Sequence, residues 1–194
     1  MEATKISTII LAGGKSSRMG TDKALLQLNN RPLLQIICET AQQTSQYLYV
    51  VTPWPERYIN ILPPNCNLVR ELSSHGPLVA FAQGLSAVTT EWVLLLACDL
   101  PCLEVEAIRE WIGLLQQVPV GAIALLPKHP TKGWEPLIGF YRTRALPLIE
   151  EFIALGGTSF QSWLAQQQVA ELEVKNPQLL FNCNTPADWK KLRC

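Results

Sequence analysis

Short apolar runs that alternate with longer amphipathic segments are the feature that most constrains the fold of this chain. The runs Trp92–Ala97 and Gly121–Leu126 contain no charged side chain, which is typical of strands buried on both faces of a parallel sheet. Pro32–Gln43 instead carries apolar residues at helical spacing. Alternation of this kind over 194 residues predicts a single α/β domain, residues 1–194, with a mostly parallel sheet.

The same periodicity locates the individual elements. The predicted strands are Thr4–Leu11, Tyr47–Val51, a short one at Leu68–Val69, Trp92–Ala97, Gly121–Leu126, Pro136–Tyr141 and an edge strand at Val169–Val174. The predicted helices are Pro32–Gln43, Gly76–Val88, Leu103–Gln117, Arg144–Ala154 and Ser159–Gln166, with another helix beginning at Thr185-Pro186-Ala187-Asp188. Ligands bind such sheets at the carboxyl ends of the strands, so the loops after Leu11 and Ala97 are the expected site.

The composition indicates a globular protein without a broad charged surface. Hydrophobic residues make up 48% of the chain and charged residues 16%. The 16 basic and 16 acidic side chains cancel, which disfavours nucleic-acid and anionic-membrane partners. The apolar run Ile6–Ala12 is far shorter than the about 20 residues of a membrane span. The scattered cysteines lack zinc-site spacing and are expected to be thiols, so we expect a cytoplasmic protein.

The segment Leu11–Lys23 follows the first predicted strand and combines glycines with cations. Gly13 and Gly14 allow the backbone to approach a phosphate and to direct successive N–H groups at it. Lys23 can act as a point charge over a triphosphate. The spacing differs from a Walker loop, because Thr and Asp follow Gly20, and from the dinucleotide fingerprint, which requires Gly-x-Gly. A nucleoside triphosphate site is therefore predicted, the alternative being a glycine turn with solvated basic residues.

The loop reads Leu-Ala-Gly-Gly-x-Ser-x-Arg-Met-Gly-x-Asp-Lys and resembles the signature of the molybdenum cofactor guanylyltransferases, the family of molybdopterin-guanine dinucleotide biosynthesis protein A. The wider nucleotidyltransferase superfamily shares a looser version, and the Gly13-Gly14 pair favours the guanylyl branch. The match continues through Gly76-Pro77-Leu78, Cys98-Asp99-Leu100-Pro101 and Asn182-Cys183-Asn184-Thr185-Pro186. The resemblance implies a three-layer α/β/α, Rossmann-like nucleotidyltransferase fold.

The resemblance also implies an activity and a set of site residues. GMP would pass from GTP to molybdenum-molybdopterin, giving molybdopterin guanine dinucleotide and pyrophosphate. The residues implied to bind the nucleotide are Leu11, Ala12, Gly13, Gly14, Lys23, Glu71, Gly76, Pro77, Leu78 and Asp99. Lys23, Asp99 and Arg18 would be catalytic, with Mg2+ on Asp99, and Asn182 and Asn184 would contact the molybdopterin.

Several of these residues also have a simpler interpretation. Asp99 precedes Pro101 and could be the acceptor of an Asp-x-Pro turn. Glu71 stands where the family usually has aspartate and could be a solvated loop acid. Gly76-Pro77 is also an ordinary helix start. Asn182 and Asn184 could be turn residues.

Other activities also remain open. Molybdenum cofactor cytidylyltransferases and other small-molecule nucleotidyltransferases share the looser motif, and a non-catalytic nucleotide-binding module is the alternative outside enzymes. The resemblance further implies contact with molybdenum-loading proteins and with molybdoenzymes that receive the cofactor.

Overall fold

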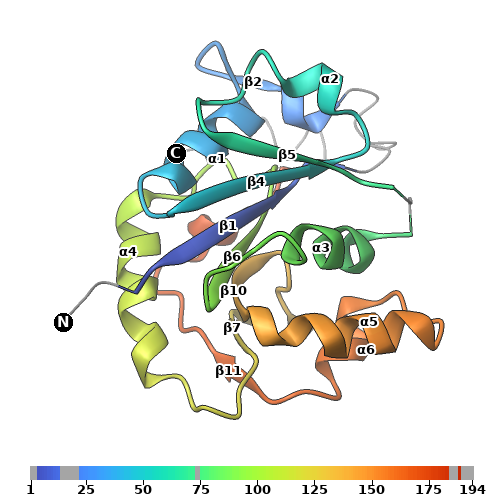
Figure 1. Ribbon diagram of the computed structural model, residues 1–194. Helices are drawn as coiled ribbons and strands as arrows, with labels where there is room; N and C mark the ends of the chain where they lie inside the picture. The colour runs from blue at the N-terminus through green and yellow to red at the C-terminus, as the bar shows by residue number, and fades with distance from the viewer. Residues whose placement is uncertain (1–3, 14–21, 73–74, 184–187, 189–194) are drawn as a thin grey trace.

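A seven-stranded sheet forms the centre of the computed structural model, which describes residues 4–13, 22–72, 75–183 and Asp188. The strand order is β11-β7-β10-β6-β1-β4-β5 (Figure 1). The strands are β1 (Ile6–Leu11), β4 (Tyr47–Thr52), β5 (Cys66–Arg70), β6 (Trp92–Ala97), β7 (Ala124–Leu126), β10 (Ile138–Arg142) and β11 (Val169–Glu171). Two short antiparallel pairs form separate sheets: β2 (Gln27–Leu28) with β3 (Arg31–Pro32), and β8 (Lys128–His129) with β9 (Gly133–Trp134).

Helices cover both faces of the central sheet. In Figure 1, α1 and α4 lie on one side, and α3, α5 and α6 lie on the other. The α-helices are α1 (Leu33–Gln42), α2 (Pro55–Tyr58), α3 (Pro77–Leu85), α4 (Val105–Leu114), α5 (Leu146–Ala154) and α6 (Phe160–Leu164). Short 3-10 turns are η1 (Lys23–Leu25), η2 (Leu115–Gln117), η3 (Thr143–Ala145) and η4 (Pro177–Leu180).

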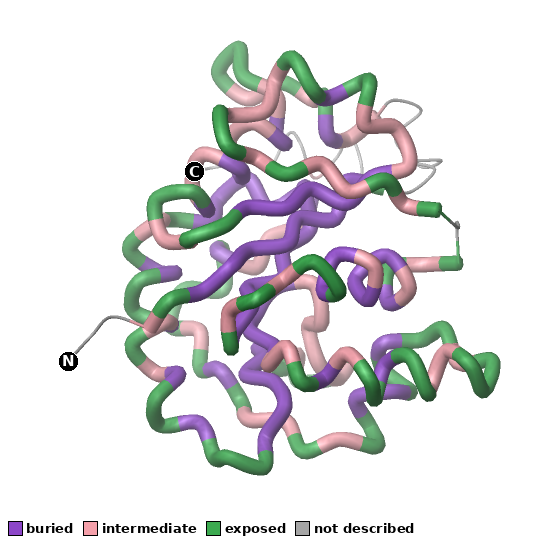
Figure 2. The backbone as a smooth tube through the Cα atoms, viewed as in Figure 1, coloured by how far each residue is buried: buried purple, intermediate pink, exposed green. Residues whose placement is uncertain are grey.

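Each face of the sheet has its own apolar core. Ile6 and Ile10 of β1 join the core that includes α1 and α4, whereas Ile9 and Leu11 join the core that includes α3, α5 and α6. This division follows because successive side chains of a strand point to opposite faces. The buried strands run through the middle of the molecule in Figure 2. The predicted three-layer α/β/α architecture with a mostly parallel sheet is confirmed.

Strand β10 differs from the other strands of the sheet in direction. It pairs antiparallel with both β6 and β7, whereas β1 pairs parallel with β4 and β6. The chain reverses between β7 and β10 through the β8–β9 pair. The predicted strand Gly121–Leu126 begins only at Ala124, and Val169–Val174 ends at Glu171. Apolar runs indicate that a strand is buried, but they carry no information on its direction.

The register of the central strands aligns their carboxyl ends. Leu11 of β1 pairs with Val51 of β4 and with Ala97 of β6, and Thr52 of β4 pairs with Arg70 of β5. The residues that follow these four strands therefore meet at one edge of the sheet. Three backbone hydrogen bonds extend the pairing past the strand ends: Ala12 N to Val51 O (2.9 Å), Cys98 N to Leu11 O (3.3 Å) and Glu71 N to Thr52 O (2.8 Å).

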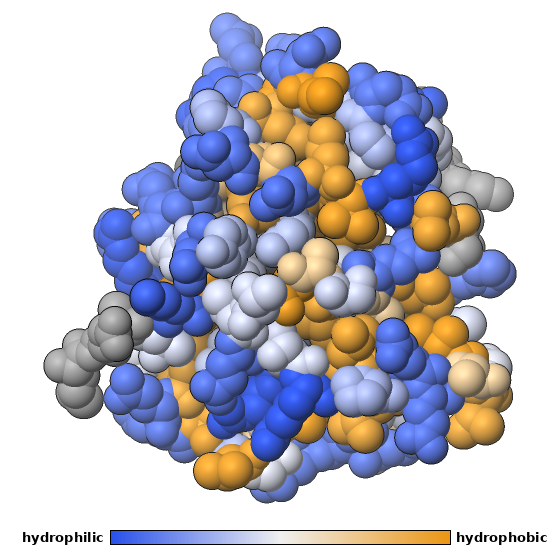
Figure 3. Space-filling model, viewed as in Figure 1, coloured by the Kyte–Doolittle hydropathy of each residue, from blue (hydrophilic) through white to orange (hydrophobic). Residues whose placement is uncertain are grey.

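The surface is mixed in character. On the face shown in Figure 3, hydrophilic side chains surround several apolar patches. Ile59, Leu72, Val120 and Leu155 are strongly exposed, and they come from four separate segments, which is normal for surface apolar residues. Among the described residues, no helix combines the length and apolar character needed to cross a lipid bilayer.

The cysteines match the sequence prediction only in part. Cys38, Cys66, Cys98 and Cys183 are free thiols, and all but Cys66 are buried. Cys102 is disulfide-bonded, which contradicts the expectation that the cysteines are thiols. Scattered spacing lacks the pattern of a zinc knuckle, but it does not prevent two distant cysteines from meeting in the folded chain.

Candidate functional site

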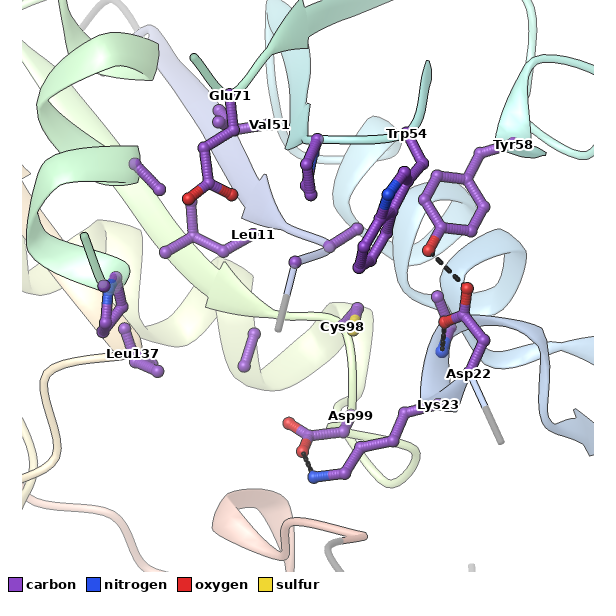
Figure 4. A pocket seen from close by; sticks show the side chains of 18 residues that line it. Leu11, Asp22, Lys23, Val51, Trp54, Tyr58, Glu71, Cys98, Asp99 and Leu137 are labelled. Atoms are coloured by element: carbon purple, nitrogen blue, oxygen red, sulfur yellow. Dashed lines mark hydrogen bonds and ion pairs between the residues drawn. The ribbon is translucent and has the colours of Figure 1, made fainter. Parts of the chain in front are cut away.

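A cavity of about 510 Å3 lies at the carboxyl ends of the central strands (Figure 4). Its lining comes from the ends of β1, β4, β5 and β6, from η1 and α2, and from the beginning of α3. This volume is in the range of small-molecule sites. The position agrees with the prediction that ligands bind after Leu11 and Ala97.

Lys23 and Asp99 form an ion pair at one end of this cavity. Lys23 begins η1 and Asp99 follows β6, and the Nζ of Lys23 lies 3.1 Å from Oδ2 of Asp99. The exposed fractions of the two side chains are 19% and 12%, so both charges are partly removed from water. Figure 4 shows the pair facing the cavity. Two residues 76 positions apart are thus brought together at this edge of the sheet, and their roles in a triphosphate site stay a prediction.

Glu71 occupies a different part of the cavity wall. It follows β5, and its carboxylate points into the cavity toward Leu11 in Figure 4. Burial raises the pKa of Glu71 above its ordinary value, and no charged or hydrogen-bonding neighbour among the described residues contributes to the shift. The carboxylate is half-buried, and Leu11 and Val51 line the same cavity. Glu71 is therefore not a fully solvated loop acid.

Gly13 packs closely against the side chain of Glu71. A Cβ at position 13 would lie 2.8 Å from Oε2 of Glu71 and 3.3 Å from Cδ of Pro53. A Cβ here would require the end of the Glu71 side chain to move and would leave little room beside the Pro53 ring. A glycine here lets the loop after β1 pass directly over the carboxylate, which is a separate reason for glycine from phosphate binding.

The start of α3 contributes backbone to the cavity. Gly76 caps the helix with a φ of 98°, a left-handed conformation that favours glycine. Gly76, Pro77 and Ala80 line the cavity. Leu78 is fully buried in the apolar core instead, and its side chain is not part of the lining. A role of Leu78 in binding would thus run through its backbone N–H, which is one of the helix-start donors.

The Asn182 motif lies beside Asp99. The backbone N–H of Cys183 donates to the carbonyl of Asp99 at 3.0 Å. Asn182 is half-buried, donates its side-chain amide to the carbonyl of Leu180 at 3.2 Å, and is not part of the cavity lining. The structure therefore brings Cys183, near the C-terminus, to Asp99 at this edge of the sheet. Gly14, Arg18 and Asn184, which the sequence also implicates, fall outside the described residues.

The lining residues to which the sequence analysis gave no role include Asp22, Trp54 and Tyr58. Figure 4 shows Tyr58 hydrogen-bonded to Asp22. Arg57 stacks over the Trp54 ring, with Cζ 4.5 Å from the ring centroid. The sequence could have identified Trp54, because it follows the carboxyl end of a predicted strand, where ligands bind in parallel sheets.

A metal ion could be held here only with help from a ligand. Among the described residues, no group of three or more His, Cys, Asp or Glu side chains is arranged to hold a metal. Asp99 is a single hard carboxylate at the cavity wall. Mg2+ is commonly bound by one or two carboxylates together with substrate phosphates. The donor set therefore fits a metal that arrives with a phosphorylated ligand.

Comparison with known proteins places this architecture in a family. Residues 8–171 match the model of the MobA-like NTP transferase domain. A protein of Nostoc sp. named "Probable molybdenum cofactor guanylyltransferase" is 55% identical over 94% of this chain and 88% of that protein. A Synechococcus elongatus protein of the same name is 40% identical, over 96% and 97%.

A solved structure agrees with the fold. The crystal structure of molybdopterin-guanine dinucleotide biosynthesis protein A from Archaeoglobus fulgidus has a TM-score of 0.78, with 22% identity and 95% of both chains covered. The family model and the identity to the relatives indicate the same family, and the fold agrees with it. The chain is a nucleotidyltransferase that belongs to the MobA-like family and, within it, to the molybdenum cofactor guanylyltransferases.

Proposed function

We propose that this protein transfers GMP from GTP to the terminal phosphate of molybdenum-molybdopterin. The products are molybdopterin guanine dinucleotide and pyrophosphate. The Lys23–Asp99 pair at the cavity wall is the observation that carries the proposal, because nucleotidyl transfer needs a cation for the phosphates and a carboxylate for their metal. The names of the relatives support guanine as the base and molybdopterin as the acceptor.

In this reaction the acceptor phosphate oxygen attacks the α-phosphorus of GTP. A new P–O bond forms, and the bond to the β-phosphate oxygen breaks, with its electron pair leaving on pyrophosphate. No protein nucleophile is required. The chain contributes by holding the triphosphate and offsetting its charge. Lys23 supplies one charge, and residues 11–14 and Arg18 are expected to hold the remaining phosphate oxygens.

Asp99 is the residue that would hold a divalent ion. Mg2+ bound with GTP would neutralise phosphate charge as pyrophosphate leaves. Asp99 has one carboxylate oxygen on Lys23, and a divalent ion on that carboxylate would weaken this ion pair. Lys23 and Asp99 would then both act on the same triphosphate.

Glu71 is suited to read the base. A carboxylate offers two acceptor oxygens, and guanine presents two neighbouring donors, its N1–H and its exocyclic amine. Cytosine presents an acceptor beside its amine, which would repel the carboxylate. The half-buried position of Glu71 strengthens such a contact, because competing water is partly excluded. This contact favours a guanylyl over a cytidylyl transferase.

The direct test is initial-rate pyrophosphate release with GTP, CTP or ATP, each with Mg2+ and molybdenum-loaded molybdopterin. The proposal expects turnover with GTP and little with the other two. Preference for CTP would assign the chain to the cytidylyl branch. Calorimetric GTP binding without pyrophosphate release would indicate a non-catalytic nucleotide-binding module.

The proposed reaction also implies a cellular setting. We expect the reaction to take place in the cytoplasm, without a nucleic-acid or membrane partner. Molybdenum-loading proteins would supply the acceptor and molybdoenzymes would receive the product. Co-purification of the tagged full-length chain with such proteins tests this part separately from turnover.

A further inference from the structure

Two carboxylates, Asp22 and Asp99, line the same end of the cavity but have different surroundings. Asp99 contacts Lys23 and faces the cavity. Both oxygens of Asp22 accept hydrogen bonds from within the protein: Oδ1 from the Ala24 N–H at 3.1 Å, and Oδ2 from the Tyr58 hydroxyl at 2.7 Å. Asp22 therefore stabilises the local backbone through these hydrogen bonds, whereas Asp99 is positioned to contact a ligand in the cavity.

Asp22 fixes the turn that presents Lys23. It is the N-cap of η1, and its side chain accepts the N–H of Ala24, the second residue of the turn. Its own carbonyl accepts the N–H of Leu25 at 3.1 Å. Lys23 is the residue between Asp22 and Ala24, so both hydrogen bonds fix the backbone that carries it. An isolated 3-10 turn of three residues has little stability of its own, so its geometry depends on the cap.

Tyr58 in turn fixes the cap. Its residue exposure is 0%, and its ring packs in the core cluster on the α1 and α4 side of the sheet. Burial and the neighbouring Asp22 raise the pKa of Tyr58, which keeps the hydroxyl protonated as a donor. A short hydroxyl–carboxylate hydrogen bond of this kind is among the stronger ones. The Tyr58–Asp22 hydrogen bond thus connects α2 to the N-cap of η1, across 36 residues of sequence.

We infer that Tyr58 is a positioning residue of the transfer reaction, which holds Lys23 against the triphosphate by way of Asp22. The inference rests on the proposed function, since it assigns Lys23 to the phosphates of GTP. Tyr58 does not touch the phosphates. Its hydroxyl sets the direction from which the Lys23 ammonium approaches them.

The test is Tyr58→Phe, which keeps the buried ring and removes the hydroxyl. We expect kcat/KM for GTP to fall roughly tenfold, the size expected for one strong hydrogen bond to a charged group, while KM for molybdopterin stays unchanged. Tyr49→Phe is the matched control. Its hydroxyl also makes one hydrogen bond, to the carbonyl of Ala87 at 3.1 Å, on the opposite face of the sheet. The control should retain wild-type kinetics.

A second comparison separates positioning from a general loss of structure. In a Lys23→Ala background, Tyr58→Phe should have no further effect on kcat/KM, because the hydroxyl acts through Lys23. A full additional loss in that background, or a Tyr58→Phe enzyme with unchanged kinetics, would overturn the inference. If the wild-type enzyme itself fails to use GTP, the proposed function has failed instead, so the two outcomes are distinct.

Discussion

The two carboxylates that face the cavity, Asp99 and Glu71, have opposite electrostatic situations. Asp99 has a lysine ammonium at 3.1 Å, so a ligand at this end must replace an existing ion pair. Glu71 has a pKa raised by burial, with no compensating neighbour among the described residues. A ligand that brings hydrogen-bond donors to Glu71 therefore breaks no ion pair among the described residues. The difference indicates that the Asp99 end is built for exchange of charges and the Glu71 end for selection of a polar base.

The largest expected effect lies at the Asp99 end. Asp99→Asn preserves the shape of the side chain and removes its charge. We expect kcat/KM for GTP to fall on the order of a hundredfold, because the divalent ion that would offset the phosphate charge loses its carboxylate ligand. Initial rates of pyrophosphate release measure this.

The control for this variant is Glu110→Gln. It also removes a carboxylate paired with a lysine, Lys175, but on the outer surface of α4. It should leave the rate unchanged. If Asp99→Asn retained activity within about twofold of the wild type, the Asp99 end would be no more than a structural ion pair.

A second test of the difference between the Asp99 and Glu71 ends changes the contact between Gly13 and Glu71. In Gly13→Ala the new methyl group would lie 2.8 Å from Oε2 of Glu71 and would push the carboxylate aside. We expect KM for GTP to rise about tenfold or more, because the base contact is displaced. Glu71→Asp shortens the side chain, so the double variant should recover part of the loss. An equal or greater loss in the double variant would show that the methyl group acts on the phosphates and not through Glu71.

The sequence predicted the site residues that directly follow the central strands better than those contributed by other segments. Gly13 and Asp99 follow strongly apolar runs, so the rule that ligands bind at the carboxyl ends of parallel strands located both. Tyr58 could not be found in this way. Its role depends on a hydrogen bond to a residue 36 positions away, and only the packing of α2 against η1 brings the two together. The antiparallel direction of β10 was equally hidden, because burial leaves the same apolar pattern in either direction.

A third, smaller effect concerns the choice of base. Glu71→Gln replaces one acceptor oxygen by an NH2 group, which would oppose one of the two guanine donors. We expect kcat/KM for GTP to fall about tenfold, with CTP and ATP unaffected, so that the preference for GTP narrows. Competition assays with the three nucleotides measure the ratio. Glu106→Gln, on the exposed face of α4, is the control. An unchanged ratio would remove Glu71 from base selection.

The smallest expected effect is on stability. It tests the electrostatic difference between Glu71 and Asp99 in the protein without bound nucleotide. Burial raises the pKa of Glu71 in the folded chain above its value in the unfolded chain. The stability that this group contributes is therefore complete below the unfolded pKa and is lost as the pH rises through the folded pKa. Glutamine at this position cannot titrate. The Tm of Glu71→Gln relative to the wild type should thus increase as the pH rises above the ordinary pKa of glutamate, about 4.3, as measured by thermal unfolding monitored with circular dichroism.

The companion variant Glu71→Asp keeps the charge and should keep the wild-type pH dependence, which makes it the control for the loss of side-chain packing. A Tm difference between Glu71→Gln and the wild type that stays constant with pH would mean that water hydrates the Glu71 carboxylate as fully as a surface group. The two ends of the cavity would then differ only in the presence of Lys23. Selection of guanine would have to come from backbone groups, of which the helix start at Gly76 and Pro77 is the nearest source in the cavity lining.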